Sequence, residues 1–175
     1  MAIELLRIPM NKFETFVYDA LRALGMSDEE ADYCGRGVIQ SHIRCLPGQG
    51  QGVSKLLQYQ ERISKGWIKL GAPVSTINEA PSLAIIDGGN GLGSMIGQKA
   101  MKVAVDKAKV NGVGTAIVRN SSHFGSSAVH ARVALEYDCI GIAMTNAGPE
   151  MAPWGGTTSV VGTNPWSIAA PTGKG

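Results

Sequence analysis

Apolar residues recur at helical spacing in three segments near the start of the chain. In residues 11–24 they fall every three or four positions, which is the repeat of an amphipathic helix. The second segment opens on Ser27 and Glu30, whose spacing is that of a capping box. A third segment, residues 53–66, has the same helical repeat. The pattern predicts an N-terminal helical segment within residues 1–72.

Further along, short apolar and β-branched runs alternate with helical repeats. They predict, in order, strand 82–87, helix 95–110, strand 113–118, helix 126–137, strand 139–144 and strand 166–171. The run after Gly112 is typical of a strand buried on both faces, and the glycines at 88–91 predict a turn. This order favours an α/β fold in which a mixed or parallel sheet is covered by helices. Residues 73–175 are expected to form the first part of that sheet domain.

Composition narrows the class of protein. The chain has 175 residues, 44% of them hydrophobic, which is enough to bury a sizeable core. Its 16 basic and 14 acidic residues leave a net charge of +2, with no basic patch for nucleic acid or for a membrane surface. A small-molecule or protein partner is the expectation that remains.

The three cysteines have neither disulfide nor metal-ligand spacing. The first residues lack the charged and then apolar pattern of a secretion signal, and no apolar run reaches the roughly 20 residues that a membrane span needs. We therefore expect a cytoplasmic protein that binds no structural metal.

A polar cluster, Asn120 to Gly125, directly follows the strand predicted at 113–118. In open α/β sheets ligands collect beyond the carboxyl ends of strands, so His123 is the leading catalytic candidate. The alternative is a histidine that only orders its loop by hydrogen bonding. His130, in the helix that follows, is expected to be solvated.

A second loop, residues 145–156, leaves the carboxyl end of the strand at 139–144. Its backbone amides and the Thr145 and Asn146 side chains suit a pyrophosphate or a ribose, although a rigid surface turn would look the same. A third polar turn, at residues 162–165, is interpreted as structural only. The dinucleotide fingerprint G-x-G-x-x-G is absent, so a standard Rossmann site is not supported.

Four motifs in this order resemble the type 2 malate/L-lactate dehydrogenase family. They are Asn120-Ser121-Ser122-His123-Phe124-Gly125, Met144-Thr145-Asn146, Met151-Ala152-Pro153-Trp154-Gly155-Gly156 and Gly162-Thr163-Asn164-Pro165. The family includes ureidoglycolate, sulfolactate and diketogulonate enzymes and cyclic-imine reductases. The resemblance implies a homodimer that binds NAD or NADP on a sheet domain unlike the Rossmann fold. It also implies hydride transfer to or from a small 2-oxo, 2-hydroxy or 2-imino acid.

The same resemblance assigns the cofactor-binding residues. By motif they are His123, Phe124, Gly125, Thr145, Asn146, Ala147 and Pro149. Relatives often have serine where this chain has Ala147, which removes one hydroxyl contact.

The segment that carries the proton donor in relatives departs from the family pattern here. Gly50 and Gln51 stand where a Ser-His pair is expected, and Lys55 replaces the arginine that holds the substrate carboxylate. Lysine attracts a carboxylate as a point charge rather than through a bidentate fork, whereas a glutamine amide orients a substrate but transfers no proton. Gln51, Lys55 and Tyr59 are thus the predicted substrate-side residues.

A rival alignment makes Ser41-His42 the missing donor pair, but the Gly-Val and Lys-Leu-x-x-Tyr positions then do not follow. Otherwise His42 is a helix-terminal histidine. In either alignment, residues 42–52 contain Pro47 and three glycines and are expected to interrupt the helical segment as an irregular loop.

The last predicted strand lies only a few residues before Gly175, and relatives continue beyond this point. We therefore expect an incomplete sheet that a complementary C-terminal polypeptide completes, in a dimer of such pairs. Two functions follow. The first is a nicotinamide-dependent oxidoreductase; the second is a diverged enzyme or ligand-binding subunit on the same scaffold, which the loss of the Ser-His pair favours.

Overall fold

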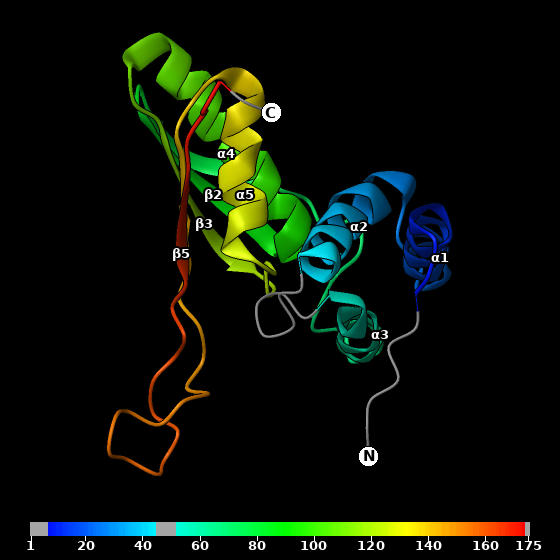
Figure 1. Cartoon of the computed structure of the whole chain (residues 1–175). Coiled ribbons are helices and arrows are strands. Elements are labelled where there is room, and N and C mark those ends of the chain that lie inside the picture. The colour runs from blue at the N-terminus through cyan, green and yellow to red at the C-terminus, as the bar shows by residue number, and fades with distance from the viewer. Residues whose placement is uncertain (1–6, 45–51, 174–175) are drawn as a thin grey trace.

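The computed structural model describes residues 7–44 and 52–173 (Figure 1). The helical segment contains α1 (Met10–Ala23), α2 (Asp28–Ile43), the short 3₁₀ helix η1 (Gly52–Ser54) and α3 (Lys55–Ser64). All three predicted helices are confirmed. Together they bury one apolar cluster, which includes Phe13, Val17, Leu21, Cys34, Val38, Leu56 and Tyr59.

The predicted capping box is present at the start of α2. The Glu30 backbone N–H donates to Ser27 Oγ at 3.3 Å, and Glu30 Oε2 accepts the Ser27 N–H at 2.9 Å. The other carboxylate oxygen of Glu30 accepts the Gly71 N–H at 2.7 Å. Glu30 is buried, so one carboxylate fixes both the start of α2 and the link toward the sheet.

Replacing Glu30 by alanine is expected to lower the free energy of unfolding by about 2–3 kcal/mol, because a helix cap and hydrogen bonds to a buried charged group are lost together. Urea unfolding measures this loss. The neighbouring Glu29 is the control, since its ion pair with Lys99 is solvent-exposed and its removal should change stability by less than about 1 kcal/mol. Equal effects of the two replacements would contradict the role given to Glu30.

The first sheet has three strands in the order β1 (Ser75–Ala80), β2 (Leu83–Gly91) and β3 (Thr115–Ser121). β1 pairs antiparallel with β2, and β2 pairs parallel with β3, so the predicted mixed sheet is confirmed. β1 was not predicted, because it is exposed along its whole length and lacks a repeated apolar position. The turn predicted at 88–91 is an irregular part of β2 instead: Gly89 and Asn90 have φ of +59° and +61°, the register with β3 shifts after Asp87, and pairing resumes between Gly91 and Ser121.

The second sheet pairs β4 (Gly141–Met144) with β5 (Trp166–Ala169) in antiparallel register. Helix α4 (Gly93–Asn111) packs on β2 and β3, whereas α5 (Ser127–Val133) and the 3₁₀ helix η2 (Ala134–Tyr137) follow β3, and α5 packs on β4 and β5. In Figure 1 the helical segment lies to one side of these layers, and the chain between β4 and β5 projects away from them. The described strands therefore form two small sheets rather than one.

β3 is half-exposed, so the prediction of a strand buried on both faces is wrong. Its residues alternate between exposed and partly buried, and Ile117 is 51% exposed. Helix α4 covers one face of the sheet, and nothing in the described residues covers the other face of β3.

Two glycines allow the helices to approach the strands closely. A Cβ at Gly114, just before β3, would lie 1.9 Å from the Ala104 carbonyl oxygen of α4. A Cβ at Gly141 would lie 2.1 Å from the Ala131 carbonyl oxygen of α5. Backbone therefore packs on backbone where each strand begins, and this sets the position at which the two strands deliver their following loops.

Candidate functional site

The loop that carries His123 begins with a residue in the left-handed conformation. Asn120 has φ +51° and its amide donates to Asp87 Oδ2 at 2.8 Å, while Arg119 Nε donates to the same oxygen at 3.1 Å. Hydrogen bonds from the Gly89 backbone and from Asn120 lower the pKa of Asp87. The Asp87 carboxylate in the middle of β2 thus fixes the last residues of β3, from which the His123 loop leaves.

Hydrogen bonding fixes the orientation of the His123 ring. The Gly125 N–H donates to His123 Nδ1 at 3.1 Å, so Nδ1 carries no proton and the neutral ring holds its proton on Nε2. Desolvation by surrounding protein lowers the pKa of His123 to about 4, with further lowering by the charges of Lys55, Arg62 and His130. Although the residue is exposed to solvent, its imidazole is therefore neutral near neutral pH and presents an Nε2–H donor.

Lys55 connects the separate parts of the predicted site. Its side chain is buried, and its ammonium donates to Gln58 Oε1 at 2.8 Å and lies 5.7 Å from the centre of the Tyr59 ring. Burial lowers the pKa of Lys55 to about 8, Arg62 lowers it further, and Glu150 opposes this shift. Lys55 interacts electrostatically with His123 and with Glu150. The charge of Lys55, at the start of α3, is therefore close enough to act on His123 and to be acted on by Glu150 of the 145–156 loop.

Tyr59 is placed in the helical core. It is 2% exposed, its hydroxyl hydrogen-bonds with the Cys34 thiol, and burial raises its pKa well above the ordinary value. Burial also raises the pKa of Cys34 to about 12, so this thiol is unreactive. The hydroxyl predicted to contact the substrate carboxylate is thus enclosed by protein, and the Tyr59 ring supports Lys55 instead. Gln51 lies outside the described residues.

The loop after β4 is held by the turn at 162–165. The Ala147 N–H donates to Asn164 Oδ1 at 2.8 Å, and the Thr145 N–H donates to the Pro165 carbonyl at 3.1 Å. Gly162 lies so close that a Cβ there would be 2.2 Å from the Ala147 carbonyl oxygen. The third polar turn is therefore structural, as the sequence predicts.

The surface of this loop suits a polar, anionic cofactor. Asn146 and Pro149 are exposed, and Phe124 and Gly125 are partly exposed. The Asn146 amide nitrogen makes no hydrogen bond to the described residues, and the Lys55 and Arg62 charges lie near His123. Whether these residues contact a nicotinamide dinucleotide, whose pyrophosphate is anionic, stays a prediction. Residues 7–44 and 52–173 contain no cluster of three or more side chains suited to hold a metal ion.

The irregular loop predicted at 42–52 falls mostly on residues 45–51, which lie outside the described residues. On either side of them, α2 ends at Ile43, and a Cβ at Gly52 would lie 2.9 Å from His42 Nδ1. His42 is helix-terminal and its ring stacks on Phe13 with centroids 4.7 Å apart.

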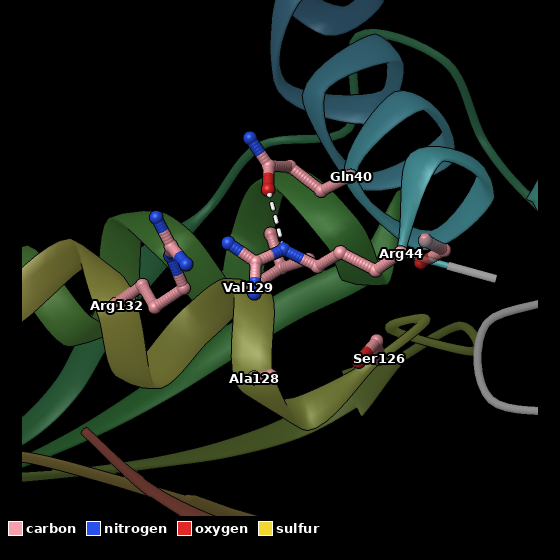
Figure 2. Close-up of a pocket in the computed structure, with 7 residues that line it drawn as sticks. Gln40, Arg44, Ser126, Ala128, Val129 and Arg132 are labelled. Carbon is pink, nitrogen blue, oxygen red and sulfur yellow. Dashed lines mark hydrogen bonds between the residues drawn. The ribbon is translucent and has the colours of Figure 1, made fainter. Parts of the chain in front are cut away.

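A shallow hollow between α2 and α5 is shown in Figure 2. Gln40 and Arg44 line it from α2, joined by a hydrogen bond of 3.1 Å, and Val129 and Arg132 line it from α5. None of the residues predicted for catalysis or for cofactor binding lines this hollow. The predicted site residues therefore lie outside this hollow.

The expectation that His130 is solvated is wrong. It is 1% exposed, because its ring packs on the bare backbone of Gly97 in α4 and on the Phe124 ring. Burial lowers the pKa of His130 to about 4 from an ordinary value of 6.5. The sequence carries no local signal for this burial, since the glycine that makes room for the ring belongs to another helix.

This burial predicts loss of stability in mild acid. The unfolded chain takes up a proton on His130 below about pH 6.5, whereas the folded protein resists protonation down to about pH 4. The stabilising contribution is complete above pH 6.5 and is lost as the pH falls toward 4. When the pH falls from about 7 to about 5, we expect protonation of His130 in the unfolded chain to lower the free energy of unfolding by about 2 kcal/mol. Urea unfolding at both pH values, with His130→Phe as the comparison, measures it; an unchanged pH dependence in the variant would contradict the assignment.

The sequence of the chain is similar to those of known dehydrogenases. Residues 8–175 match the family described as malate/L-lactate dehydrogenase. The chain is 40% identical to a malate dehydrogenase of Pyrococcus abyssi over 95% of this chain and 45% of that protein. It is 36% identical to an L-sulfolactate dehydrogenase of Methanocaldococcus jannaschii over 87% of this chain and 44% of that protein.

The fold of the chain is also similar to that of a malate dehydrogenase. The structure of the malate dehydrogenase from Pyrococcus horikoshii OT3 superposes with a TM-score of 0.89 at 38% identity, over 95% of this chain and 47% of that one. The chain thus spans about half the length of the relatives it matches.

Proposed function

Because the chain belongs to the malate/L-lactate dehydrogenase family, we propose that it contributes the N-terminal half of a nicotinamide-dependent oxidoreductase. The enzyme would transfer hydride between NAD or NADP and a small 2-oxo, 2-hydroxy or 2-imino acid. The observation that carries this proposal is the exposed His123 ring after β3, whose Nδ1 accepts the Gly125 N–H at 3.1 Å and which therefore presents an Nε2–H donor.

The bound nicotinamide supplies or accepts the hydride. In this assignment His123 Nε2–H donates a hydrogen bond to the oxygen of the reacting 2-oxo group and stabilises the negative charge that develops there. The proton that completes the hydroxyl group would come from solvent water, and in the reverse direction it would return to water. A neutral imidazole suits this role because its Nδ1 accepts the Gly125 N–H. The structure thus favours the substrate-polarising role of His123 over that of an acid or base.

Lys55 is the proposed anchor of the substrate carboxylate. Its buried ammonium faces few opposing charges, since only Glu150 acts on it with the opposite sign among the described groups. Lys55 is 2% exposed, so its ammonium is proposed to attract the carboxylate through its charge rather than by direct contact. Phe124, Gly125, Thr145, Asn146, Ala147 and Pro149 are the proposed cofactor contacts.

The assembly is also part of the proposal. Relatives are about twice as long as this chain, and the apolar side chains Ile117, Ile142 and Ile168 are exposed on the described sheets. We infer that a complementary C-terminal polypeptide covers these sheets and that two such units form a homodimer. This surface favours protein partners over nucleic acid or membranes. Within the part of the chain that the structure describes, no helix has the length and apolar character of a membrane span.

The test uses the complete native protein, meaning this chain with whatever polypeptide accompanies it in the cell. It should bind NADH or NADPH and consume it on addition of a 2-oxo acid, followed as the loss of nicotinamide absorbance. Binding without consumption of any 2-oxo or 2-imino acid would favour the second candidate, a ligand-binding subunit. The observation that favours that alternative is Gln51, which replaces the expected proton donor.

A further inference from the structure

We propose that His130 is a positioning residue that holds the His123 loop through the peptide unit between Phe124 and Gly125. The inference rests on the role proposed for His123, and it adds a second histidine to the same site.

His130 contacts Phe124 in two ways at once. Its Nε2 lies 2.8 Å from the Phe124 carbonyl oxygen, and because a carbonyl only accepts, Nε2 must carry the proton and donate it. The two rings also stack, with centroids 4.3 Å apart and planes at 12°. Backbone and side chain of Phe124 are therefore both held.

The peptide unit transmits this restraint to His123. The Phe124 carbonyl and the Gly125 N–H belong to one planar trans peptide and point in opposite directions. His130 holds the carbonyl end, while the N–H end donates to His123 Nδ1 at 3.1 Å. Rotation of this plane would break both hydrogen bonds together, so His130 sets the donor that orients the His123 ring.

The other side of His130 is equally restricted. A Cβ on Gly97 would lie 2.7 Å from both Cε1 and Nδ1 of His130, so the ring lies flush against the backbone of α4. The ring is thus pressed between α4 and Phe124, and it places the loop at a fixed distance from that helix.

The burial of the His130 ring lowers the stability of the folded protein. A purely structural role of His130 does not explain this cost. His130 Nδ1 is buried and has no hydrogen-bond partner within residues 7–44 and 52–173. A buried acceptor without a donor is unfavourable, and an apolar residue would fill this position without that cost. What an apolar residue does not supply is the hydrogen bond to the Phe124 carbonyl.

Three replacements separate the two contacts. His130→Phe keeps an aromatic ring without the donor, His130→Gln keeps a donor without the ring, and His130→Leu keeps neither. The exposed Arg132→Ala in the same helix is the control for disturbance of α5. All are made in the complete native protein, and thermal unfolding confirms that each is folded.

The first readout is the titration of His123, followed by NMR of its Cε1–H signal. Loss of the Gly125 donor removes a bond that favours the neutral ring, so the pKa of His123 should rise in His130→Phe and His130→Leu and stay nearly unchanged in His130→Gln and Arg132→Ala. The second readout is turnover, where kcat should fall about 10- to 100-fold in the first two variants, with partial recovery in His130→Gln.

The titration decides the inference independently of turnover. If folded His130→Phe and His130→Leu proteins titrate His123 as the wild type does, the inference is overturned. If the wild type shows no turnover but these variants shift the His123 pKa, the positioning role stands and the proposed oxidoreductase function fails.

Discussion

Replacing His123 by alanine is expected to lower kcat/KM for the 2-oxo acid by about 10²- to 10⁴-fold, because the donor to the reacting oxygen is removed. Cofactor affinity should fall less, since the backbone amides of the loop remain. Steady-state kinetics of the complete native protein, with nicotinamide binding measured separately, distinguishes the two effects.

His123→Gln sharpens this test. Its amide can still donate a hydrogen bond near the Nε2 position, so it should keep more activity than the alanine variant if His123 polarises the substrate. If His123 is instead the essential acid or base, both variants should lose activity equally. A folded His123→Ala protein with an unchanged rate would remove His123 from the mechanism.

The pH dependence of the wild type follows from the same assignment. The active form has a neutral ring, and the pKa of His123 is lowered to about 4. The contribution of His123 is therefore constant through neutral and mildly acidic pH and is lost as the pH falls through about 4. A decline centred on the ordinary histidine value of 6.5 would contradict the proposed environment.

The second large effect is expected from Gly93→Ala. Gly93 is the first residue of α4, and its Cβ would lie 2.0 Å from the Ser122 carbonyl oxygen and 2.9 Å from the His123 carbonyl carbon. These are backbone atoms that a rotamer change does not move. We expect a loss of about 3 kcal/mol in the free energy of unfolding, together with weaker cofactor binding because the displaced loop carries His123.

Ser122→Ala is the matched comparison. It removes the hydroxyl that accepts the Gly93 N–H at 2.9 Å and adds no atom, so it should cost only about 1 kcal/mol. Urea unfolding of both variants measures the difference. Similar losses would show that the hydrogen bond, and not close packing, is what Gly93 contributes.

The helices could be predicted because their signals are local. The apolar repeat and the Ser27 capping box are read within a few residues of sequence, and both are present in the structure. β1 has no such signal, because its pairing with β2 depends on backbone hydrogen bonds and not on side-chain burial. The glycines at 88–91 gave a turn signal, but pairing with β3 holds Gly91 in the strand.

In the candidate site, sequence motifs identified the loops that carry the predicted residues. They did not indicate the burial or the pKa shifts of those residues. Lys55 was expected to attract the substrate carboxylate as a point charge, but its burial, which follows from how α3 packs and lowers its pKa to about 8, was not expected. The environment of His130 depends on Gly97, which belongs to another helix. Neither the burial of Lys55 nor the contact between His130 and Gly97 has a local sequence pattern, so only the structure reveals them.

The two apolar clusters differ in size, and this difference affects which part of the protein a bound ligand would stabilise. The helical segment contributes most of a large cluster, whereas the second cluster, between the first sheet and α4, has three buried members among the described residues, Ala84, Ile86 and Ala100. The sheet and its loops should therefore open locally at a smaller free-energy cost than the helices. A bound dinucleotide would select the closed arrangement, and amide protons of β3 and β4 would then gain more protection from exchange than those of α1 and α2.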